Sequence, residues 1–255
     1  MRRLGIISCQ VFEMELAHIL DGREDLDNIY MIKTSENISL AERIECHDVR
    51  FIKEPDFLPR LSRSLDVLIN ILPIGLHIDI EELEYQCNEN INSFKDITSS
   101  ILLLYGLCGN ALRNIICRED VRIAYPCDGE GMVDDCICCI LGRERYMDEL
   151  RRMGSYFLTT GFVYHRDKML KRINERTERH YDSNDSKLML ELNDYRRTLL
   201  IDVGIGPEDY IERACRLSSE LGLEMESTVA DLRMLEEAVG GALDSLSPRP
   251  CYPIG

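Results

Sequence analysis

Continuous apolar runs recur along this chain, and each is followed by a segment with helical spacing. The runs occupy residues 4–8 (LGIIS), 65–73 (LDVLINILP), 101–108 (ILLLYGLC) and 197–204 (RTLLIDVG). A strand that is apolar at every position has to be buried on both faces, as an inner strand of a parallel sheet is. The alternation of such strands with helices therefore predicts an α/β fold with a mostly parallel layered sheet and helices on both faces.

The segment 165–197 interrupts this pattern because it is polar and rich in Arg, Lys and Glu. We interpret it as a solvated pair of helices with a turn at 180–186. Before it, residues 136–153 have the spacing of one helix and residues 155–164 have the character of a strand. We therefore expect a single α/β unit over residues 1–255, which could comprise two lobes around a cleft with the polar segment near their junction.

The chain is strongly acidic, with 46 Asp and Glu against 30 Lys and Arg and a formal net charge of −16. Such a surface repels nucleic-acid phosphates and anionic lipid, and it suits metal cations or a basic partner protein. The basic and apolar N-terminus meets Glu13 and Glu15 too soon for a secretory signal, and no apolar run approaches about 18 residues. We therefore expect a cytoplasmic protein that binds neither nucleic acid nor a membrane.

Three of the eleven cysteines stand where predicted strands give way to helices. Cys9 ends the first strand, Cys108 ends another between Leu107 and Gly109, and Cys136 opens a helix after a Gly/Asp-rich loop. The carboxyl ends of parallel strands share one edge of the sheet, where ligands bind, so three thiols from distant parts of the sequence could meet there. A helix N-terminus also lowers the pKa of a thiol and so favours the metal-binding thiolate.

The remaining cysteines are predicted to be reduced thiols that pack as small apolar residues, as free cysteines do in a reducing compartment. Cys215, for example, lies in an amphipathic helical segment. Cys127, beside Asp128, is an outside candidate for the site. The residues predicted to serve only packing are Cys46, Cys87, Cys117, Cys138, Cys139, Cys215 and Cys251.

Three thiolates suit a zinc ion, which takes three cysteines and one further ligand, or three protein ligands and an open position. The fourth ligand could be His77, which follows the strand ending at Pro73, or Glu15, which lies early in the first helix. His77 is the softer donor and is favoured. An iron–sulfur cluster is an alternative, but such clusters usually show compact cysteine spacing, and only residues 136–139 approach it here.

Several stretches of the chain resemble those of a known family. They are IISCQVFEMEL, LPIGLH, YGLCGNAL, DDCICCILGRERY, GSYFLTTG and ADLRMLEEAVGG, which together span nearly the whole sequence. The sequence resembles a family of uncharacterised prokaryotic proteins, well represented in methanogenic archaea, whose genes often lie near corrinoid-dependent methyltransferase genes. The family pattern keeps cysteines at the positions of Cys9, Cys108 and Cys136, and Glu15 and His77 fall in its recurring segments.

Together, the three thiols and this resemblance imply a zinc–thiolate protein that acts in or beside corrinoid-dependent methyl transfer and one-carbon metabolism. Its partner would be a corrinoid protein or a methyltransferase subunit. One alternative is a non-catalytic module that binds or regulates a methyltransferase, and another is an iron–sulfur or redox-sensing protein. The sequence does not decide whether the protein is itself an enzyme. One departure from the family pattern is Asp134, where the family commonly has His.

Overall fold

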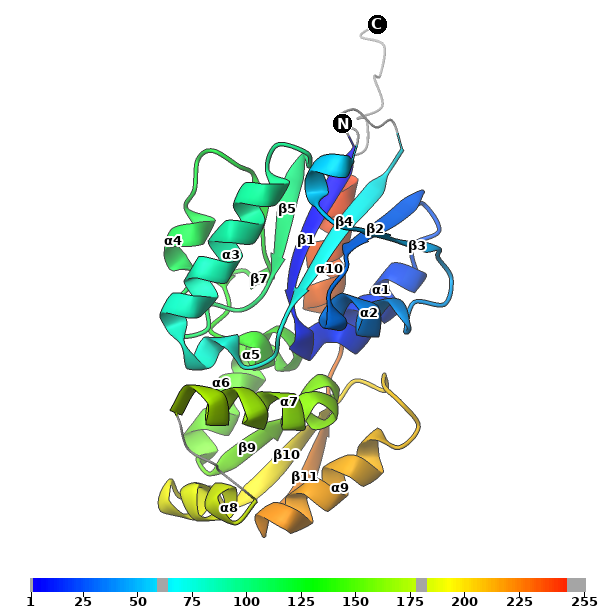
Figure 1. The fold of residues 1–255 in the computed structure, drawn as a ribbon. Helices are drawn as coiled ribbons and strands as arrows, with labels where there is room; N and C mark the ends of the chain where they lie inside the picture. The colour runs from blue at the N-terminus through cyan, green and yellow to red at the C-terminus, as the bar shows by residue number, and fades with distance from the viewer. Residues whose placement is uncertain (1, 59–63, 178–182, 247–255) are drawn as a thin grey trace, which may run out of the picture.

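A parallel six-stranded sheet forms the centre of the first of two lobes (Figure 1). The structure, a computed structural model, describes residues 2–58, 64–177 and 183–246. All neighbouring strands of this sheet run parallel, which confirms the predicted α/β class. In spatial order the strands are β3 (Val49–Ile52), β2 (Asn28–Ile32), β4 (Asp66–Leu72), β1 (Arg3–Cys9), β5 (Ser100–Leu104) and β6 (Ile123–Ala124).

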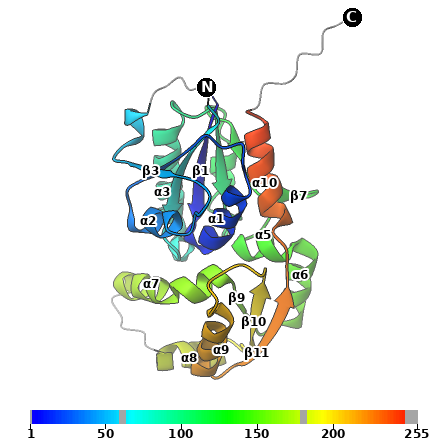
Figure 2. The ribbon, with the colours of Figure 1, turned by 90° about the vertical axis from the view of Figure 1, so that its right-hand side faces the viewer.

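Helices cover both faces of this sheet, so its inner strands are buried throughout. Every residue of β1, β4 and β5 is buried, as their continuous apolar sequences predict. One face carries α3 (Ile80–Phe94), and the opposite face carries α10 (Arg233–Asp244) beside α1 (Glu13–Asp21) (Figure 2). The other elements of this lobe are α2 (Ser35–Ala41), α4 (Arg113–Ile116), α5 (Cys136–Leu141), the hairpin of β7 (Cys127–Asp128) and β8 (Gly131–Met132), and the 3-10 turns η1 (Gln10–Phe12), η2 (Pro55–Phe57) and η3 (Leu76–Ile78).

A smaller parallel sheet builds the second lobe around an apolar cluster of its own. Its strands, in spatial order, are β11 (Glu224–Val229), β10 (Arg197–Asp202) and β9 (Ser155–Leu158), and its helices are α6 (Arg143–Arg152), α7 (Thr160–Thr177), α8 (Ser183–Leu192) and α9 (Tyr210–Leu221). The polar segment 165–197 thus supplies most of α7 and α8. After β11 the chain returns to the first lobe as α10.

Several sequence-based boundaries were wrong. The strand expected to end at Cys108 ends at Leu104, and α8 begins at Ser183 within the turn expected at 180–186, whose first residues lie outside the described part of the chain.

Two further boundaries were wrong for a clear local reason. The helix predicted over 136–153 is divided at Gly142, whose φ of 80° lies outside the helical region, into α5 and α6. The strand predicted over 155–164 ends at Leu158. Thr159 then begins a helix, because its Oγ1 accepts a hydrogen bond from the Phe162 N–H at 3.1 Å and so caps the first turn of α7.

No helix within the described residues is both long and apolar enough to cross a lipid bilayer.

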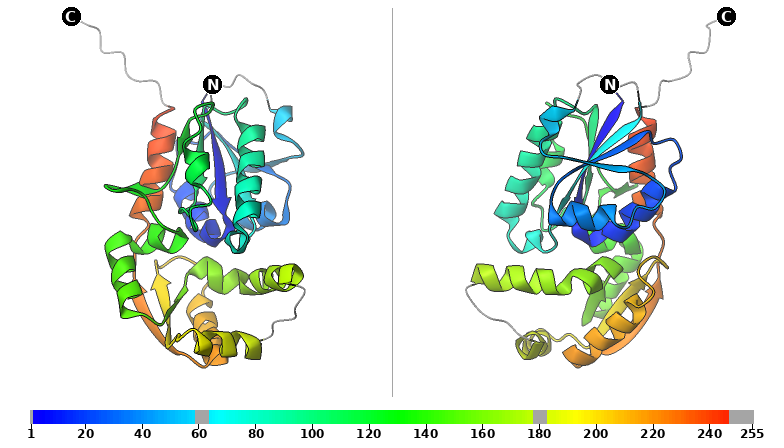
Figure 3. Two further views of the ribbon diagram at one scale, coloured as in Figure 1. Left: turned by 90° about the vertical axis from the view of Figure 1, so that its left-hand side faces the viewer. Right: turned by 45° about the vertical axis from the view of Figure 1, so that its right-hand side comes forward.

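The first turn of α7 lies against the first lobe, and this contact sets the position of the second lobe (Figure 3). A Cβ added to Gly161 would lie 2.1 Å from the carbonyl oxygen of Val11, so only glycine permits this approach. One turn later, Nε2 of His165 lies 3.1 Å from Oε2 of Glu13 in a buried contact. The guanidinium of Arg43 stacks 4.8 Å from the ring of Tyr164. The two lobes therefore meet at a packed contact.

Candidate functional site

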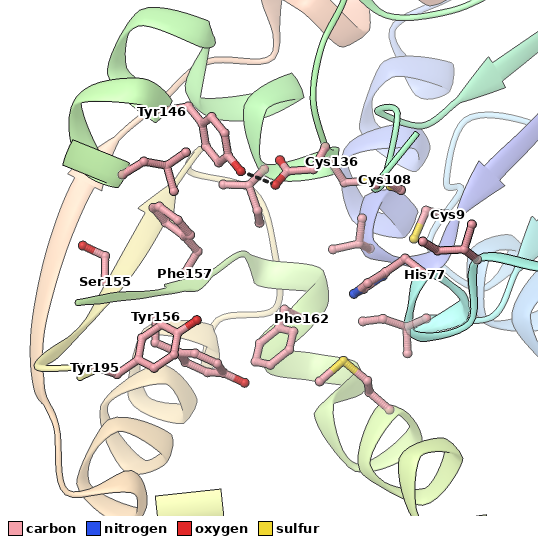
Figure 4. Close-up of a pocket in the computed structure, with 18 residues that line it drawn as sticks. Cys9, His77, Cys108, Cys136, Tyr146, Ser155, Tyr156, Phe157, Phe162 and Tyr195 are labelled. Atoms are coloured by element: carbon pink, nitrogen blue, oxygen red, sulfur yellow. Dashed lines mark hydrogen bonds between the residues drawn. The ribbon is translucent and has the colours of Figure 1, made fainter. Parts of the chain in front are cut away.

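A cleft of about 600 Å³ lies between the carboxyl edge of the six-stranded sheet and the second lobe (Figure 4). The first lobe contributes Cys9, His77, Cys108 and Cys136 to its wall. Cys9 is the last residue of β1, and Cys108 follows β5, so both lie where a parallel sheet presents its strand ends to a ligand. The second lobe closes the opposite side with aromatic and aliphatic side chains.

The structure brings together the three thiols that the sequence placed at strand–helix junctions. The Sγ atoms of Cys108 and Cys136 are 3.8 Å apart. Cys136 also interacts electrostatically with Cys9, so it neighbours both of the other thiols. All three are largely screened from solvent, and their side chains converge at one end of the cleft (Figure 4).

A strained turn presents Cys108 to the cleft. Cys108, Gly109 and Asn110 have φ values of 46°, 72° and 68°, three consecutive residues in the left-handed region. Two of them are not glycine, and such a conformation persists only where the surroundings enforce it. The N–H groups of Leu107 and Cys108 donate to the carbonyls of Val133 and Asp134, each at 2.9 Å. These bonds tie the Cys108 turn to the loop that carries Cys136.

Asp135 positions the helix that Cys136 begins. One oxygen of its carboxylate accepts from the N–H of Cys138 at 2.9 Å and caps α5. The other accepts from the hydroxyl of Tyr146 at 2.5 Å, which joins α5 to α6. Burial and this hydrogen bond raise the pKa of Tyr146, so its hydroxyl stays a donor at neutral pH. Asp135 thereby holds Cys136 beside Cys108.

Gly106→Ala is expected to destabilise the protein by about 1–3 kcal/mol through overpacking. An added Cβ would lie 2.2 Å from the carbonyl carbon of Asp135, so the two loops that carry Cys108 and Cys136 would have to separate. Urea unfolding measures the loss of stability. Gly129→Ala is the control, since a Cβ there meets no described atom within 4 Å. Equal stability of the two variants would show that the loops need no such close approach.

The thiols differ in their affinity for protons. The pKa of Cys9 is lowered because the Cys136 thiol donates to it, assisted by the backbone N–H of Val11 and by Tyr105, and these outweigh burial. The pKa of Cys136 is raised because its thiol bonds to Cys108 and Cys9 and because it is buried. Of these two thiols, Cys9 therefore becomes a thiolate more readily than Cys136 does.

His77 joins the thiols at the cleft, whereas Glu15 does not. His77 follows β4 in the turn η3, its accessible surface faces the cleft, and burial lowers its pKa against the opposing charge of Asp135 (Figure 4). Its imidazole can therefore be neutral and act as a ligand. Glu15, by contrast, is fully buried and is not part of the cleft lining, and its electrostatic neighbours are Glu13 and Arg43. Glu15 is close to Cys9 in sequence, but Cys9 ends β1 and Glu15 lies in α1, so the change of chain direction between them separates the carboxylate from the cleft.

Two cysteines predicted only to pack also border the thiol cluster. Cys87 on α3 and Cys139 on α5 are buried and interact electrostatically with Cys108 and Cys9, and burial raises the pKa of both. They therefore remain protonated beside the site. Among the other cysteines, Cys138 is buried, Cys46, Cys117, Cys127 and Cys215 are exposed, and Cys251 lies outside the described residues.

Tyr105 is a residue of the site that the sequence reasoning missed. Its side chain is 1% exposed, and its hydroxyl has no hydrogen bond of standard geometry within the described part of the chain. The hydroxyl nevertheless contributes to the lowered pKa of Cys9, which places it next to that sulfur. Its position at the start of the YGLC stretch, directly after an apolar strand, is the sequence signal that could have identified it.

The described His, Cys, Asp and Glu side chains do not already form a group of three or more spaced to hold a metal ion. The 3.8 Å contact between Cys108 and Cys136 is therefore the fixed element of the cluster. Metal binding by the trio would require side-chain adjustment around this pair.

A family model described as "Protein of unknown function (DUF1638)" matches residues 71–239. The matched region contains His77, Cys108, Cys136 and both walls of the cleft, while Cys9 lies before it. No curated protein and no solved structure shows significant similarity to the chain.

Proposed function

The chain belongs to the DUF1638 family, and we propose that it is a zinc–thiolate protein whose ion is held by Cys9, Cys108 and Cys136. The observation that carries this proposal is the 3.8 Å separation of the Cys108 and Cys136 sulfurs. A tetrahedral zinc ion with Zn–S bonds of about 2.3 Å separates its sulfur ligands by about 3.8 Å. The pair thus already has the spacing of two zinc ligands, and Cys9 adjoins it.

The neighbouring residues suit such a site. The backbone N–H of Val11 and the Tyr105 hydroxyl stabilise a thiolate at Cys9, as the outer contacts of metal ligands commonly do. His77 could complete the coordination, or the fourth position could stay open toward the cleft. A zinc ion with an open position supplies a Lewis acid that activates a bound thiol. The apolar side chains of the cleft would meanwhile exclude water.

We assign this site a role in or beside corrinoid-dependent methyl transfer in one-carbon metabolism. The support is the sequence resemblance together with the chemistry of thiolates, which are good nucleophiles toward an activated methyl group. The expected partner is a corrinoid protein or a methyltransferase subunit. The net charge of −16 would favour a basic docking surface on that partner.

Metal analysis tests the proposal directly. Protein purified with and without oxygen is expected to contain about one zinc per chain after gel filtration, since three thiolates bind zinc tightly at neutral pH. Retention of the ion against a weak chelator would show specific binding. Less than a tenth of an equivalent under both conditions, after incubation with zinc, would contradict the zinc site.

A redox or iron–sulfur role is the second candidate, favoured by the same contact between Cys108 and Cys136. Two thiols at 3.8 Å can form a disulfide after a small rotation, and additional cysteines lie nearby. A brown protein with a visible absorption band, containing iron and acid-labile sulfide, would support a cluster. A non-catalytic module is distinguished by a pull-down experiment in which Cys108→Ser abolishes binding to a methyltransferase subunit.

A further inference from the structure

The cleft wall opposite the thiols is built from aromatic rings. Tyr156 meets Phe162 with centroids 5.7 Å apart at 80°, and it meets Tyr195 at 5.6 Å and 89°. The three rings come from β9, α7 and the segment before β10, so only the tertiary structure joins them (Figure 4). All three residues line the cleft and are only partly buried, so their rings are accessible to a ligand.

Basic side chains are scarce in the cleft lining. No lysine or arginine lines the cleft within the described residues, and His77 is its single basic side chain. Arg166 and Arg197 act on Tyr156 and Ser155 from outside the lining, and each forms an ion pair with a glutamate. Asp135 contributes a carboxylate that forms no ion pair with any described residue. Both of its oxygens accept hydrogen bonds from neutral donors, the Tyr146 hydroxyl and the Cys138 N–H.

Phosphate-bearing and carboxylate ligands therefore fit this cleft poorly. Their charge would face Asp135 without a lysine or arginine to balance it, and the net charge of −16 adds to that repulsion. A cation with ordinary N–H donors would need several acceptors, and this wall offers only the hydroxyls of Tyr156 and Tyr195, because the Ser155 hydroxyl is bonded to Glu149 and Arg197. An alkylated cation needs none, because methyl groups cover its charge and aromatic faces attract it.

We propose that the cleft binds a small alkylated onium ion, a quaternary ammonium or a sulfonium, against the wall of Tyr156, Phe162 and Tyr195. A volume of about 600 Å³ accommodates such an ion. The ion would lie across the cleft from Cys9, Cys108 and Cys136 (Figure 4). The role of the thiols beside the bound ion rests on the proposed function. Binding of the ion depends only on the aromatic wall and on the absence of lysine and arginine from the described lining.

Calorimetric titration with matched probes tests this inference. Choline and its uncharged isostere 3,3-dimethylbutan-1-ol have the same shape, so a preference for choline isolates the effect of charge. We expect choline to bind at least about tenfold more tightly than the isostere, as expected for cation–π recognition. Tetramethylammonium and trimethylsulfonium then distinguish the two onium classes. Equal binding of choline and the isostere, or no binding of any onium ion, would overturn the proposal.

Aromatic substitutions locate the ion. Tyr195→Leu and Phe162→Leu are each expected to reduce choline affinity about three- to tenfold and to leave the isostere nearly unchanged. Tyr85→Leu is the control, because Tyr85 is 58% exposed on α3 and outside the cleft lining. Two aromatic variants guard against the failure of one to fold, and choline binding unaffected in both would refute the site.

The same titrations on zinc-loaded and zinc-free protein separate this inference from the proposed function. Choline binding by a protein that takes up no zinc would overturn the zinc site and support the onium site. A zinc-loaded protein that binds no onium ion would support the zinc site and overturn the onium site.

Discussion

Serine at position 9, 108 or 136 is expected to lower the zinc affinity of the protein by about a hundredfold or more. Loss of a directly bonded ligand should exceed the 10- to 100-fold effect of removing an outer contact. A serine hydroxyl is nearly the size of a thiol, but it does not ionise at neutral pH and is a poor zinc ligand. The thiols of Cys108 and Cys136 are already 3.8 Å apart, so each contributes without a large rearrangement.

Competition with a chromophoric chelator measures these affinities, and circular dichroism verifies that each variant is folded. Cys215→Ser is the matched control, because Cys215 is an exposed thiol on α9 in the second lobe. His77→Gln tests whether the imidazole is the fourth ligand. A loss of zinc affinity that is smaller than that of the cysteine variants, but measurable, would indicate that it is. Unchanged zinc affinity in all three cysteine variants would refute the trio.

The free energy of unfolding is expected to decrease as the pH rises from about 4.5 to about 7, because Glu15 is buried without a partner. Burial raises the pKa of its carboxyl from 4.5 to about 7, and neither oxygen has a hydrogen bond to a described residue. In this interval the folded protein binds a proton that the unfolded chain has released. The stabilising contribution is thus complete below pH 4.5 and lost by the time the pH has passed 7.

A shift of this size corresponds to about 3 kcal/mol, an order-of-magnitude figure for a fully buried group. Glu15→Gln removes the ionisation, so the stability difference between variant and wild type should change by about 2.5 kcal/mol between pH 5 and pH 8 in urea unfolding. The comparison cancels the pH dependence that the variant and the wild type share. A variant whose stability follows the wild-type pH profile would show that Glu15 is ionised or solvated in the folded protein.

Glu13→Gln is the control for this experiment, because it stands two residues away and should behave oppositely. His165, Arg43 and Ser39 stabilise the charged carboxylate and lower the pKa of Glu13 to about 2, despite burial. Its substitution should therefore destabilise the protein at both pH 5 and pH 8. The pair contrasts a buried charge that has partners with one that has none.

Much of the first lobe could be predicted from sequence because its inner strands are nearly continuous apolar runs. The runs at β1, β4 and β5 indicate burial on both faces without knowledge of their neighbours. Elements whose boundaries depend on one residue were harder to predict. Gly142 divides a helix, and Thr159 caps one inside an expected strand, although neither alters the apolar pattern.

The location of the candidate site could be predicted from the sequence, but the full set of residues that form it could not. The strand–helix junctions indicated the shared edge on which Cys9, Cys108 and Cys136 now lie. Whether they hold a metal remains a prediction. The direction of a side chain beyond a strand end depends on packing, so Glu15 was grouped with them on its position alone, and Tyr105 was overlooked although it adjoins Cys9.

By itself the sequence determined the layered parallel sheet and the edge at which its thiols gather, because both follow from local apolar pattern and strand direction. Only the tertiary structure decided the 3.8 Å contact between Cys108 and Cys136, the burial of Glu15 and the aromatic wall that faces the thiols. These features depend on how residues far apart in the chain approach one another. Glycines such as Gly106 and Gly161 permit those approaches, and the local pattern of apolar residues does not encode them.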